Sequence, residues 1–410
     1  MESRHRIRIG DASGISDVAT DAVDLVVTSP PYPMIELWDE QFACQSESVA
    51  AALEDGDGER AFEAMHECLH SVWREVARVL APGGVAAVVV GDATRTLDGR
   101  DRVYPNHARV TDAFEALDFD PLPNVLWRKP TNAASKFLGS GMVPPNAYVT
   151  LEHEYVLLFR NGGSRREFEP GATRRYESAY FWEERNRWFS DVWTDVQGAR
   201  QRRDDGRVDD GAETSAADSR QRGDDRPTVR SDDGPGAKGD DGPPTAGGDD
   251  DIPGAGTADV ASSHGHDAPT ARGRTGAYPF EIPYRLVCMH SVYGDTVLDP
   301  FLGTGTTTLA AMVAGRDSVG YEIDPEILST VGERVEGVPG LSRRVVSDRL
   351  DAHRRFVRSA RADGTTFDYE ATHYDFPVRT RQEREIRFRV VEDVTERPDG
   401  YRVRYEPAGE

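Results

Sequence analysis

Short apolar runs alternate with amphipathic stretches in the N-terminal part of the chain. Arg6–Ile9 and Val23–Thr28 predict strands, and the second has the continuous β-branched character of a strand buried on both faces. Residues 59–80 carry apolar side chains at helical spacing and are followed by Ala-Pro-Gly-Gly, which ends helices. Val85–Val90 predicts another strand. This alternation predicts an α/β fold with a doubly wound, mostly parallel sheet.

The same alternation returns towards the C-terminus, where Thr296–Asp299 predicts a strand, Thr306–Ala314 a helix and Ser318–Ile323 the next strand. The other predicted elements are strands at 124–127 and 154–159, a helix at 350–361, and a hairpin formed by 386–391 and 401–405. Residues 197–275 contain no Phe, Tyr or Trp and are rich in Asp, Gly, Arg, Ser and Pro. Such a segment cannot bury enough apolar surface to offset its chain entropy, so we expect a disordered insertion.

The charge of the chain indicates the kind of environment in which this protein works. The 410 residues carry a net charge of −23, and only three of the 49 basic residues are lysines. An acidic, arginine-dominated composition is typical of proteins from salt-loving archaea, because dense carboxylates keep a surface hydrated and molar salt screens their repulsion to within about 3 Å. The charge does not exclude a nucleic-acid partner, but it requires attraction to phosphate to be local.

Membrane, export and metal signals are absent from the sequence. No apolar stretch of about 18 residues exists, and the N-terminus lacks the apolar core of a signal peptide, so we expect a cytoplasmic protein without a membrane span. Cys44, Cys68 and Cys288 form no Cys-x-x-Cys pair. Neither a zinc site nor a disulfide framework is therefore expected.

The first candidate motif is Thr28-Ser29-Pro30-Pro31-Tyr32, directly after a buried strand. A turn there lies at the edge of the sheet where doubly wound folds bind ligands. An exocyclic base amine is a poor nucleophile because its lone pair is delocalised. The Ser29 hydroxyl and the Pro30 carbonyl could accept its hydrogens and favour a tetrahedral form, while Tyr32 could stack on a base swung out of a duplex. The alternative is an ordinary Pro-Pro turn.

The second candidate motif is Asp-Pro-Phe-Leu-Gly-Thr-Gly-Thr-Thr at 299–307, between a strand and a helix. Its glycines allow close approach of a ligand, and the helix N-terminus offers free N–H groups. Glu322 follows Gly303 by about 20 residues, the spacing from which a carboxylate binds ribose hydroxyls. No third glycine and no phosphate-loop lysine are present, which favours an adenosine without a pyrophosphate. A tight turn without a ligand is the alternative.

Together, Thr-Ser-Pro-Pro-Tyr, the 299–307 loop and Gly-Tyr-Glu-Ile at 320–323 resemble the amino-methylating DNA methyltransferases. The catalytic tetrapeptide precedes the cofactor loop, as in the circularly permuted β group of that family. The resemblance covers residues 5–196 and 276–335. It implies a seven-stranded-type methyltransferase sheet, S-adenosyl-L-methionine as cofactor, double-stranded DNA as substrate, and no metal. A cognate restriction endonuclease is an expected partner if the mark protects DNA.

The resemblance also assigns roles to residues. The implied catalytic residues are Ser29, Pro30, Pro31 and Tyr32, and the implied cofactor-binding residues are Asp11, Phe280, Asp299, Pro300, Phe301, Gly303, Gly305, Thr306, Thr307 and Glu322. Asp11 is expected near the adenine amine, Phe280 against the methionine end of the cofactor, and Asp299 on the methionine amino group.

The resemblance divides the chain into functional segments. These are a catalytic half at 1–161, a target-recognition region at 162–196, the disordered insertion at 197–275, a cofactor-binding half at 276–335, and a C-terminal extension of unassigned role at 336–410. In the target-recognition region, DNA contacts are expected from Arg174, Arg175, Arg185 and Arg187, because guanidinium groups read guanine edges and phosphates. A salt-adapted surface with some core aromatics is the alternative for each of these residues.

Serine at position 29 favours N4 of cytosine as the target, because Asp or Asn there goes more often with N6 of adenine in the family; Pro33 replaces an asparagine frequent in adenine enzymes. Methylation at C5 needs a thiolate that normally follows a proline, and none of the three cysteines does. A tRNA guanine-N2 methyltransferase would carry the two motifs in the opposite order. A non-catalytic DNA-binding protein need not have kept both motifs intact. The halophile character is compatible with the palindrome CTAG as target site.

Overall fold

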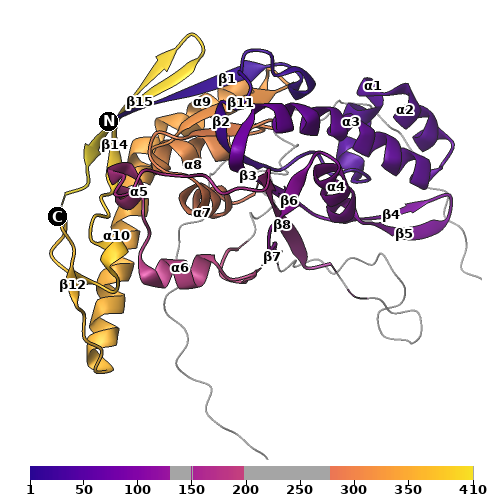
Figure 1. Cartoon of the computed structure of the whole chain (residues 1–410). Helices are drawn as coiled ribbons and strands as arrows, with labels where there is room; N and C mark the ends of the chain where they lie inside the picture. Colours follow the sequence, from indigo (N-terminus) through magenta and orange to yellow (C-terminus); the bar gives the residue numbers. More distant parts are fainter. Residues whose placement is uncertain (130–148, 150, 198–277, 410) are drawn as a thin grey trace, which may run out of the picture. The chain divides into compact units, whose positions relative to one another are not determined.

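A central sheet of eleven strands organises the residues that the computed structural model describes, which are 1–129, 149, 151–197 and 278–409 (Figure 1). In spatial order the strands are β14 (Arg389–Arg397), β15 (Gly400–Pro407), β1 (Glu2–Ile9), β11 (Asp317–Glu322), β10 (Thr296–Asp299), β2 (Val23–Thr28), β3 (Leu80–Val90), β8 (His153–Asn161), β7 (Val125–Arg128) and β9 (Val192–Trp193). The remaining strand, β6 (Phe119–Pro121), pairs with β8.

Five neighbouring strands, β1, β11, β10, β2 and β3, pair in parallel, so they all end at one edge of the sheet, the carboxyl edge. β8 runs antiparallel to β3, and β7 antiparallel to β8. The first residues of β8 and the last residues of β7 therefore also lie at the carboxyl edge. The expected mostly parallel, doubly wound sheet is confirmed.

Alternating side chains of the buried strands fill two hydrophobic layers. On β2, Val26 faces one cluster, whereas Leu25 and Val27 face the other. The first layer is covered by α3 (Gly58–Val79) and α4 (Asn106–Glu115), and the second by α7 (Glu281–His290), α8 (Thr306–Ala314), α9 (Ile327–Glu336) and the start of α10 (Val338–Ala362). Burial on both faces explains why β2 and β10 read as continuous apolar runs.

The other elements surround this core. They are the helices α1 (Asp39–Gln45), α2 (Glu47–Glu54), α5 (Thr173–Glu177) and α6 (Trp182–Trp188), the hairpin of β4 (Ala93–Leu97) and β5 (Arg100–Tyr104), the pair of β12 (Tyr369–Glu370) and β13 (Pro377–Val378), and 3₁₀ turns at Ala12–Gly14, Glu36–Trp38 and Arg381–Glu383. Within the described ranges, no helix is long and apolar enough to cross a membrane.

The strand after α3 begins earlier than the sequence predicts. Leu80 already pairs with Val23, and the register then jumps to Leu25 opposite Val85, so residues 81–84 lie inside β3 as an irregularity. Gly83 has φ +79°, and a Cβ there would lie 2.7 Å from the backbone nitrogen of Arg166. The glycine is thus needed for close approach of a distant segment rather than for a loop.

The C-terminal residues join the central sheet. The predicted hairpin forms as β14 and β15, and β15 pairs with β1, so residues 389–407 continue the sheet at one end (Figure 1). The helix expected at 350–361 is longer, because α10 starts at Val338. The insertion expected at 197–275 lies, apart from Gln197, outside the described residues.

Candidate active site

The two candidate motifs meet at the carboxyl edge. Thr28, the last residue of β2, donates from Oγ1 to Oδ1 of Asp299 at the end of β10, at a distance of 2.6 Å. Asp299 Oδ1 also accepts from the backbone N–H of Phe301 at 3.1 Å. Because Ser29 directly follows Thr28, the loop near the N-terminus and the loop near position 300 border one site.

Asp299 is a buried carboxyl group, with 3% of its surface exposed. Burial is the main cause that raises its pKa to about 6; the hydrogen bonds from Thr28, Thr307 and Phe301 act in the opposite direction, and the nearby Glu322 raises it further. A carboxylate whose charge is costly in the free protein is well suited to hold a cationic group of a ligand.

Glu322 ends β11, and its carboxylate is held in place by backbone donors. Oε2 accepts from Gly303 N at 2.9 Å, and Oε1 accepts from Asp324 N at 3.0 Å. The carbonyl of Glu322 accepts from Gly10 N at 2.8 Å, which brings Asp11 to the same end of the sheet. Asp11 is exposed and accepts from Ser13 N at 2.8 Å. The carboxylates of Glu322 and Asp11 thus flank the space beyond the carboxyl ends of β1 and β11.

The loop between β10 and α8 approaches this space closely. Gly303 and Gly305 have φ of +51° and +78°, which side chains rarely tolerate, and a Cβ on Gly303 would find no atom nearer than 3.9 Å. The space beside Gly303 is therefore open to a ligand. Arg334 of α9 donates to the Thr304 carbonyl at 2.6 Å and fixes the loop from behind.

The segment before α7 packs on the start of α8. The Tyr278 hydroxyl bonds to Thr307 Oγ1, which in turn donates to the Val27 carbonyl at 3.2 Å. Burial and then the charge of Asp299 raise the pKa of Tyr278 well above its usual range. Phe280 stacks on Tyr284, with ring centroids 5.3 Å apart. Thr306, the first residue of α8, and Pro300 are buried, and Phe301 is half-buried.

The candidate catalytic loop, residues 28–32, is tied to the neighbouring strands. Ser29 and Tyr32 are half-buried, whereas Pro30 and Pro31 are buried. Ser29 Oγ lies 3.1 Å from Tyr32 Oη, and Tyr32 donates to Glu154 Oε2 at 3.1 Å. Burial first and Glu154 second raise the pKa of Tyr32 well above its usual range, so the phenol keeps its proton.

Asn106, which is fully buried at the start of α4, holds the end of the catalytic loop. Its Nδ2 donates to the carbonyls of Pro33 at 3.1 Å and Gly91 at 3.0 Å, and its Oδ1 lies 3.0 Å from His66 Nε2. Burial lowers the pKa of His66 to about 4, so the imidazole is neutral at pH 7 and donates to Asn106 from Nε2. Asn106 thus joins the loop after β2 to the end of β3.

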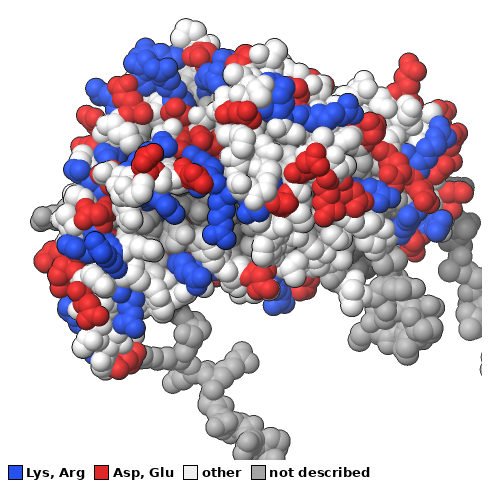
Figure 2. Space-filling model, viewed as in Figure 1, with Lys and Arg blue, Asp and Glu red and all other residues white. Residues whose placement is uncertain are grey.

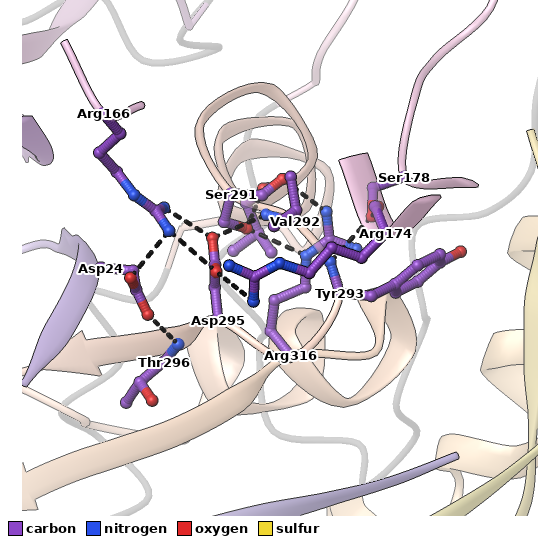
Figure 3. Close-up of polar contacts among 11 residues, drawn as sticks. Asp24, Arg166, Arg174, Ser178, Ser291, Val292, Tyr293, Asp295, Thr296 and Arg316 are labelled. Atoms are coloured by element: carbon purple, nitrogen blue, oxygen red, sulfur yellow. Dashed lines mark hydrogen bonds and ion pairs between the residues drawn. The ribbon is translucent and has the colours of Figure 1, made fainter. Parts of the chain in front are cut away.

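The predicted target-recognition region passes the opposite edge of the sheet. Figure 3 shows Arg166 between Asp24, near the start of β2, and Asp295, just before β10, at 2.9 and 2.7 Å. Arg174 lies 3.8 Å from Asp295, and Arg175 lies over the ring of Phe168. The structure therefore does not bring Arg174 and Arg175 to Ser29, and their DNA contacts stay a prediction.

The other two predicted arginines lie on α6. Arg187 is half exposed and lies 3.7 Å from Asp195, which follows β9. β9 is parallel to β7, so Asp195 lies towards the carboxyl edge. Arg185 lies over the ring of Phe189. Among the aromatics of this region, Phe181, Trp188 and Trp193 are core residues at most 1% exposed, whereas Trp182 and Phe189 are exposed.

Charges on the surface in view are mixed. Figure 2 shows Lys and Arg interspersed with Asp and Glu, without one continuous basic patch among the residues drawn in colour on this face. Within the described ranges, no group of His, Cys, Asp and Glu is arranged to hold a metal ion. Attraction to a polyanion, if present on this face, must therefore come from individual arginines.

Three residues of this site were not among the sequence candidates: Glu154, Lys129 and Asn106. Lys129 donates to Glu154 Oε1 at 2.8 Å. The position of Glu154 and Lys129 depends on β8 and β7 running antiparallel, and no sequence pattern specifies that direction. Asn106 could have been suspected only as a buried polar residue at a helix start.

Comparisons with known proteins agree with this fold. A family model described as DNA methylase matches residues 23–333. The chain is 40% identical over 389 residues to the Type II methyltransferase M.MthZI of Methanothermobacter thermautotrophicus, covering 94% of this chain and 90% of that one. It is 38% identical over 346 residues to the Type II methyltransferase M.MjaI of Methanocaldococcus jannaschii, covering 82% and 92%. Among solved structures, TTHA0409 of Thermus thermophilus in complex with S-adenosyl-L-methionine matches with a TM-score of 0.51 and 28% identity, covering 82% of this chain and 97% of that one.

Proposed function

Because this chain belongs to the DNA methylase family and is an S-adenosyl-L-methionine-dependent DNA methyltransferase of the N6/N4 type, we propose that it methylates N4 of a cytosine swung out of duplex DNA. The observation that carries this proposal is the contact of the two loops. Thr28, next to Ser29, is hydrogen-bonded to Asp299, the first residue of the cofactor loop.

The residues at the carboxyl edge fit S-adenosyl-L-methionine. Glu322 presents a carboxylate, fixed by two backbone N–H groups, to the ribose hydroxyls, and Gly303 leaves open space beside it. Asp299 offers a buried carboxylate to the methionine ammonium group, and Asp11 an acceptor to the adenine amine. When bound, the cofactor supplies a methyl group on a cationic sulfur.

The catalytic loop supplies the geometry for the acceptor amine. The Ser29 hydroxyl and the Pro30 carbonyl accept the two hydrogens of the amine, which turns its lone pair towards the cofactor side. The N–C bond would form as the S–C bond breaks, and one amine proton would leave to solvent. Tyr32, whose ring is held by Glu154, stacks on the extruded base. Catalysis then rests on orientation and on expulsion of water, without a covalent intermediate with the enzyme.

Serine at position 29 supports cytosine rather than adenine as the target base. A serine side chain is one atom shorter than Asp or Asn, so it holds its acceptor oxygen closer to the backbone. N6 of adenine is the alternative, and digestion of methylated DNA to nucleosides distinguishes N4-methylcytosine from N6-methyladenine by mass. We also propose a short palindromic target, with CTAG tested first, in a salt-rich cell. The names of the two similar Type II methyltransferases support a role in restriction–modification.

Base-resolved sequencing of DNA from cells with and without this gene tests the proposal, because it gives the base, the position and the site together. In the purified protein, Ser29→Ala should lower turnover on the identified site about a hundredfold or more and leave the affinity for the cofactor unchanged, because the lost acceptor acts on the amine alone. Equal turnover of the variant and the wild type would refute the role of Ser29.

A further inference from the structure

A chain of hydrogen bonds leads from the Ser29 hydroxyl to the surface along the carboxyl edge. Ser29 Oγ lies 3.1 Å from Tyr32 Oη, Tyr32 donates to Oε2 of Glu154 at 3.1 Å, and Oε1 of Glu154 accepts from Lys129 Nζ at 2.8 Å. The four side chains come from the loop after β2, the start of β8 and the residue after β7. The fold has therefore brought three separate segments together behind the catalytic serine.

The packing around this chain is close. A Cβ on Gly91, which follows β3, would lie 3.2 Å from Tyr32 Cε2 and 3.2 Å from Glu154 Cγ, so a glycine lets the ring and the carboxylate side chain converge. The Glu154 side chain is 14% exposed, and that of Lys129 is 44% exposed. The ammonium group compensates the partly buried carboxylate, which keeps Glu154 in a fixed position.

The chemistry of these groups determines which atom donates in each bond. A phenol has one hydrogen, and a carboxylate only accepts hydrogen bonds. The Tyr32 hydroxyl stays protonated, and its hydrogen is donated in the hydrogen bond to Glu154. The bond between Ser29 and Tyr32 must then be donated by Ser29. The Ser29 oxygen is left with its lone pairs free for the pocket.

We propose that Glu154 is a positioning residue that fixes the direction of the Ser29 hydroxyl, so that Ser29 can act only as an acceptor towards the target amine. This inference rests on the function proposed above. A serine hydroxyl alone can donate or accept, and a hydrogen turned towards the amine would oppose the hydrogens of the amine. An aspartate at position 29 would need no such device, since its carboxylate only accepts.

Glu154→Gln tests this role without changing the size of the side chain. Because the Lys129 ammonium group can only donate, it keeps the amide oxygen of the new glutamine as its acceptor. The amide nitrogen of the glutamine then faces Tyr32. Tyr32 then donates to Ser29, and the Ser29 hydrogen turns towards the amine. We expect the single-turnover methylation rate to fall about ten- to a hundredfold, while the dissociation constants for S-adenosyl-L-methionine and for duplex DNA stay within about twofold of wild type.

The decisive measurement is a double-mutant cycle with Tyr32→Phe, which keeps the ring but removes the hydroxyl that connects Glu154 to Ser29. In the Tyr32→Phe background, we expect Glu154→Gln to have no further effect on the single-turnover rate. A carboxylate that merely stabilises the fold would slow both backgrounds by the same factor. Such multiplying effects would overturn the role of Glu154.

Glu152→Gln is the matched control, because it makes the same chemical change on a neighbouring, 44% exposed carboxylate that pairs with Arg128. It should methylate at the wild-type rate. If Glu154→Gln shows no cooperative thermal transition, Glu154→Asp replaces it, because this change withdraws the acceptor by one methylene. Glu154→Asp should slow methylation in the wild-type background but not in the Tyr32→Phe background. If the wild type methylates no DNA amine, the proposed function is overturned as well. If the wild type is active and the effects of Glu154→Gln and Tyr32→Phe multiply, only the role of Glu154 is overturned.

Discussion

The buried carboxyl of Asp299 should make the stability of the unliganded protein depend on pH within a defined window. Burial raises its pKa from 3.8 to about 6, so the folded protein holds this proton more tightly than the unfolded chain does. The free energy of unfolding should therefore fall as the pH rises from about 4 to about 6, and should level off above that range. A difference of about 2 pH units corresponds to about 3 kcal/mol.

Asp299→Asn removes this charge and keeps the shape of the side chain. Relative to the wild type, the variant should gain about 3 kcal/mol between pH 4 and pH 8, because only the wild type carries the titrating Asp299 carboxyl group. At pH 4 the variant and the wild type should be about equally stable, because Thr28 and Phe301 donate to the same oxygen of Asp299 and the amide oxygen of asparagine can accept from both. Urea denaturation at a series of pH values measures both quantities. Asp351→Asn, which makes the same chemical change at an exposed position on α10, is the control.

Cofactor binding gives the second half of this test. An ammonium group beside Asp299 favours the charged carboxylate, so the affinity for S-adenosyl-L-methionine should increase with pH up to about 6 and then become constant. Asp299→Asn should bind more weakly and without this pH dependence in calorimetric titrations. A stability difference that does not change with pH, together with a flat affinity profile of the wild type, would refute the assignment of Asp299.

Other parts of the structure make further predictions. Asn106→Leu leaves the carbonyls of Pro33 and Gly91 without a donor and should lower the free energy of unfolding by about 3 kcal/mol in urea, with turnover reduced more than cofactor affinity; an unchanged unfolding midpoint would contradict this. Arg166→Met leaves the 1% exposed Asp295 without its main partner and should cost about 3 to 5 kcal/mol, measured the same way; a smaller loss than for an exposed ion pair would contradict it. Arg187→Ala should weaken binding of duplex DNA and reduce the slope of log affinity against log salt concentration by about one unit, whereas Arg174→Ala, at the other edge of the sheet, should not affect DNA binding at the pocket. Filter binding at several salt concentrations measures both effects. A larger effect of Arg174→Ala than of Arg187→Ala would place the recognition surface at the other edge.

Local sequence patterns were sufficient to predict the strands and the helix that carry the two motifs. β2, β10 and α8 begin and end where the apolar runs predict, because a strand buried on both faces and a glycine loop before a helix have distinctive local patterns. The sequence was less informative around β3, where the helix-ending residues 81–84 form an irregularity inside the strand, between the paired residues Leu80 and Val85. There the requirement for Gly83 comes from a contact with Arg166, far away in the sequence.

The sequence by itself determined the kind of fold and identified the 299–307 loop and the tetrapeptide at 29–32 as candidates, because each is encoded in a few consecutive residues. Only the tertiary structure decided which distant groups serve them. Strand direction places Glu154 and Lys129 behind Ser29, whereas Arg174 lies beside Asp295 at the opposite edge. Strand direction depends on pairing between segments far apart in the chain, so no local pattern of apolar and polar residues specifies it.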